Sequence, residues 1–112
     1  MALPEVNTAT FEEQVLGSNK PVLVDFWGPR CQPCIALMPT VEALAQQNAE
    51  RLKVVKVNAN ARENWELCRT QSVMGLPAYL IFREGKEVKR LAGANVTRET
   101  LMDAIEELFS QA

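Results

Sequence analysis

The fold of this chain is decided by one stretch, Val22-Leu23-Val24-Asp25-Phe26-Trp27-Gly28-Pro29-Arg30-Cys31-Gln32-Pro33-Cys34. Its first six residues are apolar and β-prone apart from one aspartate, and they predict a buried strand. The residues from 35 to 50 favour a helix. The two cysteines therefore lie at the junction between a strand and a helix, with Cys31 at or near the helix N-terminus.

The position of this cysteine pair predicts redox chemistry. Two cysteines three residues apart can lie within one helical turn, close enough to form a disulfide without moving the backbone. A helix N-terminus carries unpaired N–H donors and a partial positive charge, and both favour the thiolate form of Cys31. The thiolate is the nucleophile of thiol–disulfide exchange. The alternatives are a structural disulfide or two of four zinc ligands, but only Cys68 remains as a sulfur ligand and the chain has no histidine.

The composition is that of an ordinary globular protein and excludes several classes of partner. The chain has 112 residues, enough for a single domain over 1–112, and a net charge of −2. This charge gives no attraction to nucleic acid or an anionic membrane, and no apolar run approaches the roughly 20 residues that span a bilayer. The first five residues lack the basic and apolar regions of a signal peptide. A signal peptide is therefore not expected, which favours the cytoplasm. A disulfide-stapled secreted protein would be richer in cysteine and better paired than this chain, which has three.

Helix and strand signals alternate along the chain, which predicts an α/β fold with a central mixed β-sheet flanked by helices on both faces. Thr10-Phe11-Glu12-Glu13 has the form of a capping box that opens a helix ended by Gly17. Pro39 should kink the helix in which it lies. The remaining elements are expected as strands over 6–8, 21–27, 52–58, 77–82 and 87–91, and as helices over 31–50 and 62–70. Thr97 is expected to cap a final helix, whose apolar residues fall at spacings of three and four: Leu101, Ala104, Ile105 and Leu108.

These motifs, taken in order, resemble the thioredoxin family over nearly all of the chain. The resemblance implies a thioredoxin fold. It is carried by Val24-Asp25-Phe26-Trp27 before the cysteine pair, Pro33 within it, Pro39 after it, Lys56-Val57-Asn58, Gly75-Leu76-Pro77, and Gly93.

The resemblance implies a role for each residue of the dithiol. Cys31 would be the attacking nucleophile and Cys34 the resolving thiol. Asp25 would be a buried carboxylate that exchanges a proton with Cys34, although a side chain turned to solvent is the alternative. Lys56 would pair with Asp25 or be an ordinary solvated lysine of a strand.

A second group of residues is expected to bind substrate or tune the pair. Pro77 would be a cis-proline facing the dithiol, which leaves the backbone of Leu76 free to pair with an extended substrate. Trp27 would shelter the site or belong to the core. Cys68 would be a small buried hydrophobe or a regulatory thiol. The full group is Trp27, Arg30, Gln32, Pro33, Lys56, Leu76, Pro77 and Gly93.

Two residues depart from the family pattern beside the nucleophile. Most thioredoxins have tryptophan before the first cysteine and glycine after it, whereas this chain has Arg30 and Gln32. These departures concern partner choice and reduction potential, not the fold.

The implied function is that of a protein-disulfide reductase. It would act as a monomer without a cofactor or metal, on oxidised protein substrates, and take electrons from a thioredoxin-reductase-type donor or a more specialised one. The alternatives are a more oxidising disulfide oxidase or isomerase, and a docking module that uses the fold without the chemistry.

Overall fold

A four-stranded mixed sheet forms the centre of the molecule. The computed structural model describes residues 2–110. The sheet has the order β2-β1-β3-β4, in which β1 runs parallel to β2 and antiparallel to β3, and β3 pairs antiparallel with β4. The mixed sheet predicted from the sequence is confirmed. Its strands are β1 (Val22–Trp27), β2 (Lys53–Asn58), β3 (Ala78–Arg83) and β4 (Lys86–Ala92).

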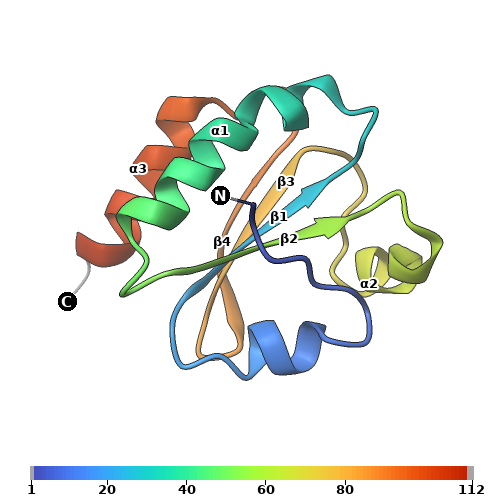
Figure 1. Cartoon of the computed structure of the whole chain (residues 1–112), viewed down its shortest axis with the longest axis horizontal. Helices are drawn as coiled ribbons and strands as arrows, with labels where there is room; N and C mark the ends of the chain where they lie inside the picture. The colour runs from blue at the N-terminus through green and yellow to red at the C-terminus, as the bar shows by residue number, and fades with distance from the viewer. Residues whose placement is uncertain (1, 111–112) are drawn as a thin grey trace.

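Helices cover both faces of this sheet, as predicted (Figure 1). The long helices α1 (Gln32–Gln47) and α3 (Arg98–Ser110) lie together on one face. The other face carries the short η1 (Glu12–Leu16), and η2 (Arg62–Asn64) leads into α2 (Trp65–Thr70). Each face has its own apolar core, because one cluster joins sheet residues to α1 and α3 and a second joins them to η1 and α2.

The alternation of side chains along β1 divides its residues between the two cores. Val22, Val24 and Phe26 belong to the core under η1 and α2, whereas Leu23 belongs to the core under α1 and α3. Successive residues of a strand point to opposite faces. Asp25 therefore projects from the same face as Leu23, towards α1 and α3.

The N-terminal segment differs from the prediction in two respects. The expected strand over 6–8 is wrong: the segment makes a single parallel bridge between Glu5 and Lys56. The predicted capping box of Thr10 and Glu13 is also wrong, because the reciprocal hydrogen bonds form one turn earlier. The Thr10 N–H donates to Asn7 Oδ1 over 3.0 Å, and the Asn7 N–H donates to Thr10 Oγ1 over 3.1 Å. Asparagine is as good a capping residue as threonine, so the earlier pair forms the turn.

The other boundaries agree closely with the sequence pattern. α1 contains Pro39, as expected, but ends at Gln47 instead of 50, where the Asn48 side chain donates to Leu44 O over 2.9 Å. The predicted cap of α3 is confirmed, since the Thr100 N–H donates to Thr97 Oγ1 over 3.1 Å. The expected apolar face of α3 is confirmed by its buried residues, Leu101, Ala104, Ile105 and Leu108.

Candidate active site

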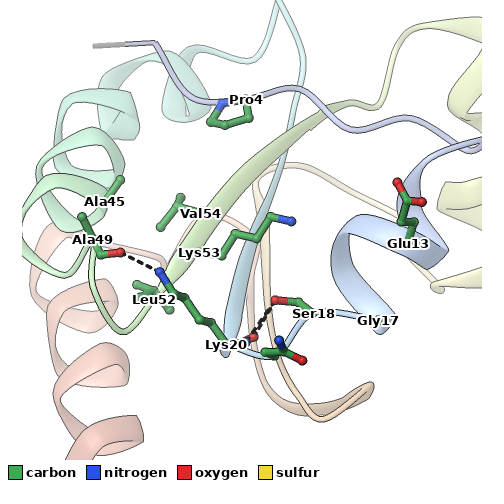
Figure 2. Close-up of a pocket in the computed structure, with 11 residues that line it drawn as sticks. Pro4, Glu13, Gly17, Ser18, Lys20, Ala45, Ala49, Leu52, Lys53 and Val54 are labelled. Carbon is green, nitrogen blue, oxygen red and sulfur yellow. Dashed lines mark hydrogen bonds between the residues drawn. The ribbon is translucent and has the colours of Figure 1, made fainter.

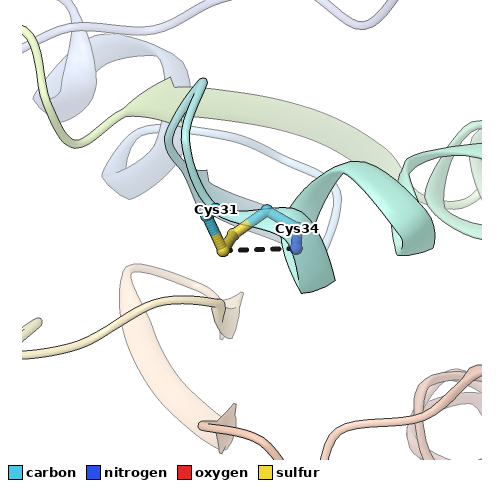
Figure 3. Close-up of a disulfide and its surroundings, with 2 residues drawn as sticks. All are labelled: Cys31 and Cys34. Atoms are coloured by element: carbon cyan, nitrogen blue, oxygen red, sulfur yellow. Dashed lines mark hydrogen bonds between the residues drawn. A yellow bond between two sulfur atoms is a disulfide. The ribbon is translucent and has the colours of Figure 1, made fainter.

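Cys31 and Cys34 form a disulfide at the N-terminus of α1 (Figure 3). Their Cα atoms are 5.2 Å apart. Cys31 is the residue that caps the helix, and its Sγ accepts a hydrogen bond from the Cys34 N–H over 3.2 Å. The chain folds this way because β1 ends in a tight loop, in which the Cys31 N–H donates to Gly28 O over 3.0 Å. The sulfur of Cys31 is thereby placed on the unpaired N–H groups of the helix.

The loop before the disulfide packs closely on two other segments. A Cβ at Gly28 would overlap the side-chain amide of Asn60 and lie 3.1 Å from Leu76 Cδ1. Only glycine leaves room for this approach. The packing brings Leu76, from the segment before β3, against the loop that carries Cys31.

The two cysteines differ in their access to solvent. Cys34 is completely buried, whereas Cys31 is half-buried and its neighbours Arg30, Gln32 and Pro33 are exposed. A partner in solution can therefore reach Cys31 and not Cys34.

Asp25 is buried beneath α1, in agreement with the expectation of a buried carboxylate. None of its surface is exposed, and neither carboxylate oxygen has a hydrogen-bond partner within residues 2–110. In the sheet register it lies between Lys56 on β2 and Tyr79 on β3. Burial raises the pKa of Asp25 to about 7, against a smaller lowering by the charge of Lys56. Asp25 can therefore gain and lose a proton near neutral pH.

Lys56 contacts an aromatic ring instead of the carboxylate. Its Nζ lies 5.2 Å from the centre of the Trp27 ring, a cation–π distance. No ion pair within 4.0 Å joins it to Asp25 in the part of the chain that the structure describes. Trp27 is half-buried, and its Nε1–H finds no acceptor among residues 2–110.

The segment from Leu76 to Pro77 has the predicted cis peptide bond, and Pro77 is buried. It is tied to the end of β4, because the Gly93 N–H donates to Pro77 O over 2.9 Å. Gly93 has a φ of +91°, which favours glycine at this position. Pro77 and Gly93, distant in the sequence, are thus brought together beside Leu76.

Three residues of this region were not found by sequence reasoning. Tyr79 is completely buried opposite Asp25. Met74, two residues before Leu76, is 95% exposed. Arg90 on β4 donates to the carbonyl oxygens of Gln71 over 2.7 Å and Ser72 over 2.9 Å, and also pairs with Glu87. Register and loop contacts reveal these residues, and no spacing in the sequence signals them.

Two further residues, Cys68 and Trp65, lie on α2, which contributes to the apolar core on the face of the sheet opposite α1. Cys68 is half-buried on α2, and burial raises the pKa of its thiol. Trp65 is 56% exposed beside Arg62.

A hollow also lies away from the disulfide (Figure 2). Its volume is about 560 Å³, and it lies between the C-terminal end of α1 and the start of β2. No group of three or more Cys, Asp or Glu side chains that could hold a metal ion occurs within residues 2–110. Over the same residues, no helix is both long and apolar enough to cross a membrane.

Comparison with known proteins gives a consistent set of relatives. A family model described as Thioredoxin matches residues 2–107. Thioredoxin 1 of Nostoc sp. is 40% identical over 106 residues, which is 95% of this chain and 96% of the relative. The thioredoxin of Synechocystis sp. gives the same identity and coverage. The bifunctional thioredoxin reductase/thioredoxin of Mycobacterium leprae is 39% identical over 99 residues, which is 88% of this chain and 21% of that longer protein.

Proposed function

The chain belongs to the thioredoxin family and is a thiol–disulfide oxidoreductase that reduces disulfides, and we propose that Cys31 attacks the substrate while Cys34 resolves the intermediate. One observation carries this assignment: Cys31 is accessible at a helix N-terminus, whereas Cys34 is completely buried one turn further on. Only the accessible sulfur can meet a protein disulfide. The buried sulfur is placed to act within the molecule.

The exchange proceeds in two balanced steps. The Cys31 thiolate attacks one sulfur of the substrate disulfide, forming a mixed disulfide and releasing the other substrate sulfur as a thiolate. The Cys34 thiol then loses its proton and attacks Cys31 Sγ. This step closes the Cys31–Cys34 disulfide and releases the second substrate thiolate. Two electrons pass from the protein to the substrate.

Asp25 is the proposed acceptor of the proton of Cys34. Cys34 is the first buried residue of α1, the helix that covers the face of the sheet from which Asp25 projects. A pKa of about 7 suits a group that takes a proton at neutral pH. The raised pKa follows from burial, and the positive charge of Lys56 keeps it from rising further.

Single cysteine variants test the division of labour. Cys31→Ser should lose all insulin reduction, whereas Cys34→Ser should still attack and then hold its substrate as a mixed disulfide that reducing agent releases. Cys68→Ser is the matched control and should retain full activity. Normal turnover by Cys34→Ser, or trapping that requires Cys68, would contradict the assignment.

The surface around Cys31 supports a specialised electron donor. Arg30 and Gln32 are exposed on either side of the nucleophile, and they replace the tryptophan and glycine of ordinary thioredoxins. Two apolar side chains in the segments that carry the site are exposed: Ile35 follows Cys34 with 44% exposure, and Met74 comes two residues before Leu76. We propose that the donor is a reductase whose surface accommodates a cation and this apolar rim.

Kinetics with a conventional bacterial thioredoxin reductase test this specialisation. The wild type should be reduced with a kcat/KM at least tenfold below that of an ordinary thioredoxin, and the variant Arg30→Trp with Gln32→Gly should recover much of the difference. Arg98→Trp, on the exposed side of α3, is the matched control and should change nothing. Equal rates for the wild type and an ordinary thioredoxin would end the proposal.

The same chemistry suggests in which compartment and in which oligomeric state the protein acts. We propose that the protein acts as a single domain and as a monomer, in the cytoplasm, without a bound cofactor. A reducing compartment suits a dithiol that must start each cycle reduced.

A further inference from the structure

Tyr79 carries a polar group that neither packing nor the exchange reaction explains. It is the single tyrosine of the chain, none of its surface is exposed, and its hydroxyl has no hydrogen-bond partner within residues 2–110. A buried unpaired hydroxyl costs about 1–3 kcal/mol. Phenylalanine would fill nearly the same space without that cost. We therefore expect the hydroxyl of Tyr79 to have a hydrogen-bond partner.

The available partner is Asp25. Tyr79 on β3 is opposite Asp25 on β1, and directly paired residues of an antiparallel sheet place their side chains on the same face. Both carboxylate oxygens of Asp25 are buried and lack hydrogen bonds to any described residue. Burial raises the pKa of Tyr79, and the charge of Asp25 raises it further, so the two groups interact electrostatically.

Besides Tyr79, the strand register places one charged residue beside Asp25. β2 presents Lys56, whose Nζ lies over the Trp27 ring. α1, which covers this face of the sheet, carries the buried Cys34, the thiol from which Asp25 is proposed to take a proton. The buried residues of α3 are apolar, namely Leu101, Ala104, Ile105 and Leu108.

We propose that Tyr79 is a positioning residue for Asp25, whose hydroxyl donates a hydrogen bond to the carboxylate through one buried water molecule. Such a molecule would find the two to four polar partners it needs in the hydroxyl and the two carboxylate oxygens. Donation stabilises the ionised carboxylate, so the hydroxyl lowers the pH at which Asp25 becomes able to accept a proton. The proposal rests on the role of Asp25 given above.

Tyr79→Phe tests this hydrogen bond. The variant should raise the pKa of Asp25, followed by the carboxyl 13C shift, by about one pH unit, as expected for the loss of a hydrogen bond to a charged group. At pH 7 the resolution of the mixed disulfide should then slow about fivefold, because the ionised fraction of Asp25 falls from one half to about one tenth. Thr70→Val, which removes a hydroxyl from α2 on the opposite face, should leave the pKa of Asp25 unchanged.

The wild-type protein provides a second test that does not require the variant to fold. Because Tyr79 is the only tyrosine, a 13Cζ label reports on it alone. Its shift should titrate with the midpoint of Asp25, about 7, and this inflection should vanish in Asp25→Asn. An absent inflection, or an unchanged pKa of Asp25 in Tyr79→Phe, overturns the proposal.

The two roles fail in distinguishable ways. If Asp25→Asn resolves mixed disulfides at the wild-type rate, Asp25 is not the proton acceptor, yet the two NMR titrations still decide whether Tyr79 is bonded to it. A second outcome is that Asp25→Asn resolves mixed disulfides slowly while Tyr79→Phe neither slows resolution nor shifts the pKa of Asp25. In that case Asp25 remains the proton acceptor, and Tyr79 has no positioning role. In the Asp25→Asn background, Tyr79→Phe should have no further effect on resolution.

Discussion

Asp25 occupies an environment that a carboxylate ordinarily avoids. It follows three buried aliphatic residues of β1, is completely buried, and has no hydrogen-bond partner within the described chain. A buried charge without a partner destabilises the folded state, and for the same reason burial raises the pKa of Asp25. We propose that a carboxylate is retained at this position because it accepts the proton of Cys34.

Replacing this carboxylate should separate stability from activity. Asp25→Asn should raise the free energy of unfolding of the oxidised protein at pH 8 by about 1–3 kcal/mol, since the buried charge is lost while a buried amide remains. Resolution of the mixed disulfide should slow roughly tenfold or more because the proposed proton acceptor is absent.

Urea unfolding and single-turnover kinetics measure the two effects. Asp103→Asn is the matched control, because Asp103 is the other aspartate of the chain and is exposed on α3. A less stable Asp25→Asn with an unchanged rate would show that Asp25 has a structural role only.

Among the secondary structure elements, β4 holds the segment between α2 and β3 in place. The Arg90 guanidinium binds the carbonyl oxygens of Gln71 and Ser72 just beyond α2, where the helix leaves carbonyl groups unpaired. Glu87 orients the same guanidinium through two hydrogen bonds of 2.7 and 2.8 Å. The segment that follows leads to Leu76, which lies against the loop that carries Cys31.

Removing this connection should loosen substrate binding without changing the redox pair. Arg90→Ala should lower the free energy of unfolding by about 1 kcal/mol, a modest value because the guanidinium is partly exposed. The KM for a protein disulfide should rise about threefold, and the reduction potential should stay as in the wild type.

Lys89→Ala is the control for this variant. Lys89 is the neighbouring residue of β4 and is exposed, with a 3.7 Å ion pair to Glu107. An Arg90→Ala variant with an unchanged KM would show that the segment holds its shape without β4.

The stability of the entire fold should depend on pH through Asp25. Its pKa is about 7 in the folded protein against 3.8 for the free side chain, so the folded state binds more protons between these values. Stability is therefore fully retained below about pH 4, falls as the pH rises towards 7, and levels off above it. From pH 5 to pH 8 the loss should be about 2–3 kcal/mol.

Urea unfolding of the oxidised protein at a series of pH values checks this dependence. The slope should disappear in Asp25→Asn and persist in Asp103→Asn. A wild type whose stability rises between pH 5 and pH 8 would contradict it.

The sequence by itself determined the order and type of the elements and the redox pair. Alternation and β-branched runs placed all four strands, and the spacing of Leu101, Ala104, Ile105 and Leu108 placed the buried side of α3. These signals are local, since they depend on side chains a few residues apart. The same locality identified Cys31 and Cys34. The local pattern gave the wrong answer near the N-terminus, because Asn7 and Thr10 form the reciprocal hydrogen bonds instead of the predicted capping box of Thr10 and Glu13.

Only the tertiary structure decided what surrounds the pair. The side chains of Lys56 and Tyr79 flank Asp25 because three strands align in one register, and Arg90 reaches Gln71 because β4 runs back past α2. Such neighbours are separated by tens of residues in the chain, so no local pattern encodes them. The pKa of Asp25 depends on desolvation and on charges brought close by folding, and neither exists before the sheet and α1 pack together.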